Sequence, residues 1–405
     1  MKKKKDKSDN IACKQSKNER IEAFLSERYE FRFNVIKSRV ESRSRGDNTV
    51  FHPISKFNLN SFKRELDTIG ISTSAENVRT IVESDFSPKI HPIREYFNLL
   101  PRIDPKINDY ILKLTKTVTV SNPEKWDEYL TKWLIAVVAN AMKDIGCQNH
   151  TCLVLTGDQG KFKTTWLDHL CPKSLQCYLF TGKIDPQNKD VQTYIAEYLF
   201  INIDDQLKAL NKRDENELKN LITTPAVKYR RPYDVYIEEY PHLASFMASV
   251  NGNDFLTDPT GSRRFLPFEV IKIDIEVAKS INMDDVFSEV LWLYENGCRY
   301  WFIDEEIDEL HRISQRFHVQ TVEYEMLMQG FKKPEEADNS FMTTAQILNY
   351  LRMYSSLSLS EKRMGEALRK AGFQRIQKRI NHSPNPVYGY RIKKIKPNPF
   401  IDTVL

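Results

Sequence analysis

The feature that most constrains the fold is a short apolar run at residues 151–156 that stops at a glycine-containing turn. A bare hydrophobic segment of this length is typical of a strand that is buried on both faces, as in parallel sheets. A strand that runs directly into such a loop and then into a helix predicts an α/β fold. The residues that follow the run are Gly157, Asp158, Gln159, Gly160, Lys161, Phe162, Lys163, Thr164 and Thr165.

This loop has the composition of a phosphate-binding loop. Such a loop needs free backbone amides, a lysine that reaches the β- and γ-phosphates, and a hydroxyl that ligates magnesium at the start of the next helix. Gly157 and Gly160 supply the turn, Lys163 the charge and Thr164 the hydroxyl. We therefore expect the segment from Gly157 to Thr165 to bind ATP together with Mg²⁺.

Two positions of the loop leave alternatives open. Phe162 stands directly before the lysine, where the usual pattern has glycine. Either the loop tolerates a side chain there, or its backbone differs from the common form, and turnover of ATP is in question. Lys161 is the alternative cation, but Lys163 is the one followed by hydroxyl residues at the right offset.

A pair of acidic residues ends the next apolar run, at residues 198–205. Nucleotide hydrolysis requires a carboxylate that holds magnesium and a second one that polarises the attacking water. Asp204 is the candidate for the metal and Asp205 for the water. In the alternative reading, the two residues only end a strand and cap the following helix.

Two further polar elements follow a third apolar run, at residues 244–250. Asn251 ends this run and is a candidate for positioning water near the γ-phosphate. Arg263 and Arg264 come later, beside a turn. Paired arginines are usually surface ion-pair formers, but in ring ATPases such a pair stabilises phosphate charge in the adjacent subunit.

Taken together, these residues resemble the virulence-associated protein E family, P-loop proteins of phages, plasmids and genomic islands that are related to superfamily 3 helicases. The resemblance covers about residues 100 to 270. Its most specific string is Leu256–Phe265. The other strings are Gly157–Thr165, Asn202–Asp205, Leu218–Thr223, Arg231–Tyr233, Ala244–Phe246 and Asn251.

The resemblance implies a P-loop NTPase core of the AAA+ or superfamily 3 type and an ATP-dependent DNA helicase or translocase that replicates a mobile element. It implies a homo-oligomeric ring, with a hexamer as the candidate form, in which Arg263 or Arg264 acts on the neighbouring site. Priming of replication would need a separate primase. The alternative is a nucleotide-regulated DNA-binding or assembly protein with little hydrolysis.

A basic and aromatic stretch between the acidic pair and Asn251 is the candidate contact with DNA. In superfamily 3 motors this interval holds an element that grips the DNA backbone with cations and aromatic rings. The alternative is a solvated loop whose arginines pair with Glu238 and Glu239. The candidate cations are Lys219, Lys228, Arg230 and Arg231.

The chain divides into five predicted segments. Residues 126–142 form a helix with an apolar stripe near the start of the ATPase region, and residues 329–340 are polar and lack an apolar period. Two helices and a basic strand after them have the order of a winged-helix module. The segments are a basic tail (1–13), an α-rich N-terminal domain (14–120), a P-loop ATPase domain with a helical extension (121–328), a linker (329–340) and a winged-helix-like basic domain (341–405).

Composition sets few limits on function. The 405 residues carry a net charge of +5, which permits a polyanionic partner without requiring one. There is no signal peptide and no apolar run long enough to cross a bilayer, so we expect a cytoplasmic protein with no membrane partner. The 6 cysteines form no CxxC pair, and we interpret those at 147, 152, 171 and 177 as thiols rather than zinc ligands.

Overall fold

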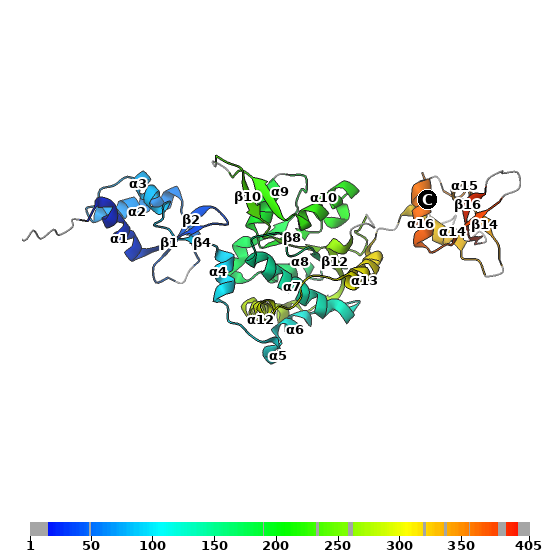
Figure 1. The fold of residues 1–405 in the computed structure, drawn as a ribbon, viewed down its shortest axis with the longest axis horizontal. Coiled ribbons are helices and arrows are strands. Elements are labelled where there is room, and N and C mark those ends of the chain that lie inside the picture. Colours follow the sequence, from blue (N-terminus) through cyan, green and yellow to red (C-terminus); the bar gives the residue numbers. More distant parts are fainter. Residues whose placement is uncertain are drawn as a thin grey trace, which may run out of the picture. The chain divides into compact units, whose positions relative to one another are not determined.

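The chain folds into two compact units, residues 1–317 and 318–405, in a computed structural model (Figure 1). The predicted basic tail at residues 1–13 and Gly261 lie outside the described residues. The structure describes residues 15–47, 50–188, 190–231, 235–257, 262–318, 321–335, 338–355, 357–379 and 386–395.

A six-stranded sheet forms the centre of the first unit. Five of its strands are parallel, and only β5 at one edge is antiparallel to its neighbour β12. Buried parallel strands explain why these segments read as continuous apolar runs in the sequence. In spatial order the strands are β5 (Val118–Val120), β12 (Phe265–Ile273), β6 (Cys152–Thr156), β11 (Ser245–Ser249), β8 (Phe200–Asp204) and β7 (Leu179–Gly182).

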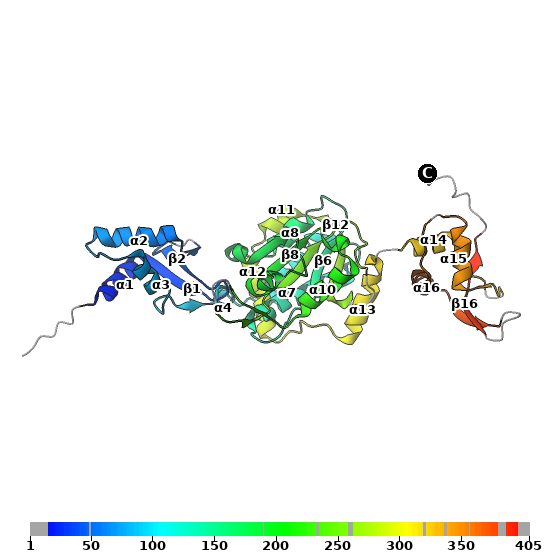
Figure 2. The same cartoon turned by 90° about the horizontal axis from the view of Figure 1, so that it is seen from above.

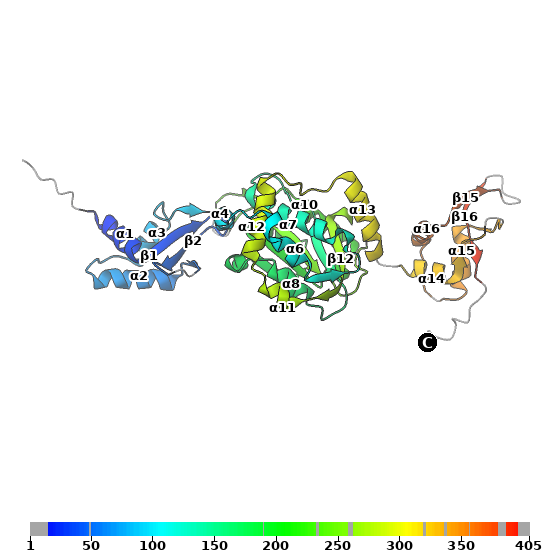
Figure 3. The same ribbon diagram turned by 90° about the horizontal axis from the view of Figure 1, so that it is seen from below.

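Helices cover both faces of this sheet, so the fold is mixed α/β, as expected. Helices α8 and α11 lie on one face, and α7 and α12 lie on the other (Figures 2 and 3). The indole of Trp133 on α7 stacks on Phe200 of β8 at a centroid distance of 6.1 Å. The helices are α4 (Pro92–Leu99), α5 (Pro105–Asn108), α6 (Tyr110–Thr115), α7 (Trp126–Met142), α8 (Lys163–His169), α9 (Asp190–Glu197), α10 (Lys212–Thr223), α11 (Ile275–Ser280), α12 (Met283–Glu295) and α13 (Asp304–Ser314).

Shorter elements connect these helices and strands. A two-stranded hairpin projects between α10 and β11, and a single 3₁₀ turn leads into β12. The hairpin strands are β9 (Ala226–Tyr229) and β10 (Glu238–Pro241). The 3₁₀ turns are η1 (Pro123–Lys125), η2 (Lys173–Tyr178), η3 (Leu207–Ala209), η4 (Ser262–Arg264) and η5 (Gln315–Phe317).

The N-terminal region differs from the α-rich domain expected at 14–120. Residues 17–90 form three helices and a four-stranded sheet of order β3-β2-β1-β4 with its own core, whereas residues from 92 onward pack into the central core. Strand β2 was missed because its side chains are mostly polar; its buried Glu41 is stabilised by Arg32 on β1 at 2.8 Å. The elements are α1 (Lys17–Arg28), β1 (Tyr29–Asn34), β2 (Arg39–Ser44), β3 (His52–Pro53), α2 (Lys56–Thr68), α3 (Ala75–Val82) and β4 (Lys89–Ile90).

The second unit begins earlier than the boundary expected at residue 341. Helix α14 and the start of the expected linker belong to it, because Leu327 and Phe331 are buried in its core. Helix α14 has apolar residues on more than one side, so its period did not reveal which core it joins. The elements are α14 (Val322–Gly330), β13 (Phe331–Lys332), β14 (Phe341–Met342), α15 (Thr344–Arg352), α16 (Glu361–Lys370), β15 (Arg375–Lys378), β16 (Val387–Arg391) and β17 (Lys393–Lys394).

The structure also bears on the expectations about membrane spans, cysteines and metal sites. Within the described part of the chain, no helix combines the length and apolarity needed to cross a bilayer. Cys147, Cys152 and Cys171 are buried free thiols, and burial raises the pKa of Cys147 to about 12. Among the residues described, no group of three His, Cys, Asp or Glu side chains is placed to hold a metal ion.

Candidate functional site

The candidate residues meet where three adjacent parallel strands end. Strand β11 lies between β6 and β8, and Ser249 at its end is level with Leu155 of β6 and Asp204 of β8. The carboxyl ends of parallel strands share one edge of a sheet, which is where open α/β folds bind ligands. The glycine loop after β6, the acidic pair after β8 and Asn251 after β11 therefore lie together.

The glycines of the loop are required by its backbone. Gly157 has φ 125°, and a Cβ there would lie 2.8 Å from the carbonyl oxygen of Val270 on β12. Gly160 has φ 83°, with open space where a Cβ would be. Both values lie in the region that residues with side chains rarely adopt.

Phe162 adopts a left-handed conformation, with φ 59° and ψ 21°. Its side chain is 54% exposed, and its carbonyl accepts the first helical hydrogen bond of α8, from the amide of Trp166, at 2.9 Å. A left-handed non-glycine residue costs roughly 1 to 2 kcal/mol. The loop thus tolerates the side chain by directing it into solvent, and this position favours glycine because of its φ value.

Lys163, rather than Lys161, turns into the loop. Its buried ammonium donates hydrogen bonds to the carbonyl oxygens of Gly157 at 3.0 Å and Asp158 at 2.7 Å, and to Asn251 Oδ1 at 3.2 Å. Burial lowers the pKa of Lys163, although nearby carboxylates, Asp205 first, act in the opposite direction. Lys161 instead donates to the carbonyl oxygen of Ile271 at 2.9 Å.

A hydroxyl and carboxylate cluster joins the start of α8 to the ends of two strands. Thr164 Oγ1 donates to Asp204 Oδ1 at 2.8 Å and lies 3.0 Å from Ser249 Oγ. Ser249 Oγ donates to the same carboxylate oxygen at 2.7 Å. Thr165 is exposed beside this cluster, as are Asp158 and Gln159 in the loop. The sequence reading missed Ser249, although its place two residues before Asn251 at the end of an apolar run was a usable signal.

Asn251 connects the lysine to the second carboxylate. Its backbone amide and its Nδ2 donate to the two carboxylate oxygens of Asp205 at 3.1 and 2.9 Å, while its Oδ1 accepts from Lys163. Asp205 itself has φ 45°, a left-handed value that aspartate tolerates better than most residues. One amide side chain thereby fixes Lys163 and Asp205 relative to each other.

Arg263 and Arg264 lie at the opposite ends of the parallel strands, where β12 and β6 begin. They precede β12, whose first residue, Phe265, is level with Cys152 at the start of β6. Five residues of strand separate Cys152 from Gly157, so the arginines and the glycine loop are roughly 16 Å or more apart. The structure therefore does not bring this pair to the loop of the same chain.

The two arginines line a cavity of about 370 Å³ together with Tyr300 and Trp301. Within the part of the chain that is described, Arg264 Nε is buried without a hydrogen-bond partner. Burial lowers the pKa of Arg264, and the neighbouring Arg263 adds to this effect. Two like charges and an unsatisfied donor favour an anionic or carbonyl-bearing partner at this cavity.

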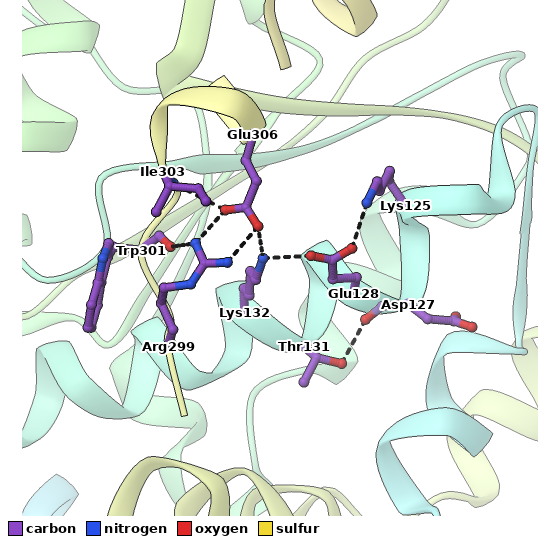
Figure 4. Close-up of polar contacts among 9 residues, drawn as sticks. All are labelled: Lys125, Asp127, Glu128, Thr131, Lys132, Arg299, Trp301, Ile303 and Glu306. Atoms are coloured by element: carbon purple, nitrogen blue, oxygen red, sulfur yellow. Dashed lines mark hydrogen bonds and ion pairs between the residues drawn. The ribbon is translucent and has the colours of Figure 1, made fainter. Parts of the chain in front are cut away.

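An ion-pair network anchors the wall of this cavity (Figure 4). Lys132 of α7 contacts Glu306 of α13 and, at 2.6 Å, Glu128; Arg299 binds both carboxylate oxygens of Glu306 at 2.6 and 2.8 Å. Although burial alone would raise it, the hydrogen bonds from Arg299 and Lys132 lower the pKa of Glu306 to about 2. Arg299 also donates to the carbonyl oxygen of Trp301 at 3.0 Å, so the network fixes the aromatic segment.

Two of the four predicted DNA-contacting cations are buried. Lys219 on α10 is 3% exposed and pairs with Glu215 at 2.7 Å, because the two residues share the inner face of the helix. Arg231 is 9% exposed and donates to the carbonyl oxygen of Ile36 at 2.8 Å. Lys219 is therefore corrected to a structural position in a buried ion pair, whereas Arg231 lines an interior cavity.

The other two predicted cations are exposed on the β9–β10 hairpin. Lys228 on β9 pairs with Glu239 on β10 at 3.4 Å, with side chains that are 68% and 58% exposed. Arg230 directly follows β9 and is exposed. The pairing with Glu239 was the alternative reading of this segment, and a pair this open to solvent leaves Lys228 accessible.

These features define an α/β protein in which a glycine loop, a lysine and two carboxylates meet at the ends of adjacent parallel strands. A family model described as the virulence-associated protein E-like domain matches residues 106–319, more than half of the 405 residues. The chain therefore belongs to the virulence-associated protein E-like family, which confirms the resemblance drawn from the sequence.

The chain is similar to the apo structure of the NrS-1 C-terminal region (305–718), with 11% identity, 92% of this chain and 98% of that chain covered, and a TM-score of 0.48. The A form apo structure of the same region matches with 13% identity over 76% of this chain and 77% of that chain, with a TM-score of 0.43. Among curated proteins, none matches.

Proposed function

We propose that this chain is an ATP-dependent motor, a helicase or translocase, that acts on DNA in the replication of a mobile element. The observation that carries the proposal is the convergence of two linked sets of side chains at one edge of the sheet. One set is Lys163, Asn251 and Asp205, and the other is Thr164, Ser249 and Asp204. Membership in the virulence-associated protein E-like family supports the link to mobile elements.

The donor set fits a nucleotide triphosphate with magnesium. The exposed loop and the first turn of α8 offer backbone amides, and the Lys163 ammonium would contact the phosphates. Thr164 and Asp204, already joined by a 2.8 Å hydrogen bond, would hold the cation, with Ser249 as an outer partner. One carboxylate and one hydroxyl suit Mg²⁺, which otherwise keeps phosphate and water ligands. When bound, the ion neutralises charge on the transferred phosphate.

Asp205 and Asn251 are the residues proposed to position water. The Lys163 ammonium donates hydrogen bonds to two loop carbonyls and to Asn251 Oδ1. Phosphates would compete for the ammonium and free Asn251 Oδ1 from that bond. The amide would then remain attached to Asp205 through its N–H groups and present its oxygen to a water molecule, which gives the site a nucleotide-dependent rearrangement.

Completion of the site is proposed to require a second copy of the chain. Arg263 and Arg264 lie at the edge of the sheet opposite the loop, and Arg264 Nε has no partner among the described residues. In a closed head-to-tail ring, of which a hexamer is the candidate form, this edge faces the loop edge of the neighbour. Either arginine would then stabilise charge on the transferred phosphate of that neighbour.

Two surfaces are proposed to contact DNA. The β9–β10 hairpin carries Lys228 and Arg230, and Val235, Tyr236 and Ile237 near its tip are each more than 70% exposed.

The second unit has the element order of winged-helix modules: α14, β14, α15, α16, then β15 and β16, in a sheet of order β14-β16-β15. Helix α16 has the position of a recognition helix in this order, and it bears exposed Lys362, Arg363 and Arg369. A separate primase would supply primers.

DNA-stimulated ATP hydrolysis tests the motor. Wild type should hydrolyse ATP faster with single-stranded DNA, and Lys163→Ala should lose at least about a hundredfold in turnover, because a charge-assisted contact to the reacting phosphates disappears. Lys161→Ala is the matched control, since the Lys161 ammonium donates to the carbonyl oxygen of Ile271 on β12. Equal, near-zero turnover in wild type and Lys163→Ala would refute the motor. If wild type does hydrolyse ATP, strand displacement on forked DNA separates unwinding from translocation.

A second function, a nucleotide-regulated DNA-binding or assembly protein, is favoured by one observation. Phe162 holds the left-handed position of the loop at an energetic cost, and its side chain stands 54% exposed over the start of α8. Here ATP binding alone would drive assembly. Light scattering with a non-hydrolysable ATP analogue measures assembly, and a parallel assay with ATP measures turnover. Assembly without measurable turnover of ATP supports regulation, whereas assembly together with turnover supports the motor.

A further inference from the structure

We propose that a basic cavity between the N-terminal sheet and the central sheet binds a phosphate group, at a site separate from the glycine loop. The cavity has a volume of about 380 Å³ and is lined by Lys89 of β4, His91 just before α4, Arg94 of α4, Arg231 after β9, and Tyr240 of β10. Its size admits a phosphate ester up to a small mononucleotide.

Arg231 is the main reason to expect an anion in this cavity. It is 9% exposed, its ring-stacking partner Tyr240 lies 4.5 Å away, and one N–H donates to the carbonyl oxygen of Ile36. Within the described ranges the guanidinium has the Tyr229 hydroxyl as a neutral neighbour but forms no ion pair with a carboxylate, and its Nε has no hydrogen-bond partner. A buried guanidinium without a counter-charge is costly, and a phosphate offers two oxygens that the planar guanidinium can bind at once.

The other polar side chains around the cavity are mostly donors. Lys89 is exposed at its mouth, and Asp144 is the one carboxylate among the described lining residues, already bound by Arg94 at 2.5 Å. Burial lowers the pKa of His91 to about 4, so the ring is neutral at neutral pH. Its Nδ1 accepts from the amide of Arg94 at 3.3 Å, which leaves the proton on Nε2 as a further donor.

The cavity lies away from the glycine loop. Leu243, one of its lining residues, precedes β11, whereas Asn251 follows the same strand at the other edge of the sheet. The inference therefore does not depend on ATP hydrolysis. Two sources could supply the phosphate: a free phosphate ester, or a DNA backbone that continues inward from Lys228 on β9 and from Arg230 directly after it.

The test uses the full chain with Lys163→Ala, which disables the glycine loop. Inorganic phosphate is titrated by calorimetry, and binding should be saturable and become about tenfold weaker in Lys89→Glu, since one attractive charge is reversed. Lys56→Glu is the matched control, because it makes the same charge change on an exposed residue of α2 outside the cavity. Arg231→Gln should weaken binding further. Because Arg231 is buried, this variant could fail to fold, and Lys89→Glu at an exposed position keeps the test independent of that outcome.

The outcomes separate the two sources and the proposal itself. If a single-stranded DNA oligonucleotide displaces phosphate and loses affinity in Lys89→Glu, the phosphate belongs to DNA; if it does not displace phosphate, a free phosphate ester is the ligand. Absence of phosphate binding, or equal affinity in Lys89→Glu and Lys56→Glu, overturns the proposal. None of these binding measurements uses an ATPase rate, so a negative result for the phosphate site is distinct from a negative result for the proposed motor.

Discussion

Replacing Glu306 with glutamine tests how the cavity wall beside Arg263 and Arg264 is held. Glu306 on α13 accepts from Lys132 on α7 and from both ends of the Arg299 guanidinium (Figure 4). Glutamine keeps the size of the side chain but removes the charge that both cations face. Because Lys132 is 8% exposed, it would then be buried with Glu128 as its one remaining partner in this network.

The magnitude follows from the pKa of the carboxyl. Its change from the usual 4.5 to about 2 corresponds to roughly 3 kcal/mol of differential interaction. Glu306 is 12% exposed, but Arg299 and Glu128 are 34% and 41% exposed, so solvent screens part of the network. We therefore expect Glu306→Gln to lower the free energy of unfolding of the first unit by about 2 kcal/mol at pH 7.

Tryptophan fluorescence in urea measures this unit selectively, since all 5 tryptophans lie within residues 126–301. The folded-state pKa is depressed, so the stabilisation is complete above about pH 4.5 and is lost as the pH falls towards 2. The difference between wild type and Glu306→Gln should accordingly shrink below about pH 4.5. Glu305→Gln, on an exposed neighbour, is the matched control. A difference below about 0.5 kcal/mol, or one that grows on acidification, would refute the reasoning.

Three further predictions concern the proposed motor. Gly157→Ala should abolish ATP binding measured by calorimetry and lower stability by about 2 kcal/mol, since a Cβ would meet a carbonyl of β12 at 2.8 Å and φ is 125°; unchanged affinity contradicts this. Replacing Lys228 and Arg230 with glutamine should reduce the salt dependence of single-stranded DNA binding by a slope of about 1.4, and an unchanged slope would exclude the hairpin. Arg264→Ala and Lys163→Ala should each be inactive, yet mixing them should restore ATPase activity if the arginine acts across subunits; no recovery in mixed oligomers would argue against that role.

Much of the candidate site could be predicted because each residue ends an apolar run. Runs of continuous apolar residues reveal buried parallel strands, and the polar residues after them necessarily share one edge of the sheet. Asp204, Asp205 and Asn251 were found in this way, together with the glycine loop. Ser249 was missed because a small hydroxyl near the end of an apolar run reads as part of the strand.

The exposure of charged residues could not be predicted from local sequence. Arg231 directly follows Arg230 in the sequence, yet Arg231 is buried and Arg230 is exposed. Burial of a cation depends on which carboxylate or carbonyl a distant segment places beside it, such as Ile36 beside Arg231. The same cause hid strand β2, whose polar side chains pair with those of β1.

The sequence by itself determined the α/β class, the family, the helix at residues 126–142 and the identity of the residues at the glycine loop, because these depend on local period and on spacing along the chain. Only the tertiary structure decided that Phe162 takes a left-handed conformation with its ring in solvent, that Asn251 joins Lys163 to Asp205, and that Arg263 and Arg264 lie at the far edge of the sheet. These features depend on strand order and register, since β11 lies between β6 and β8 although it follows both in sequence.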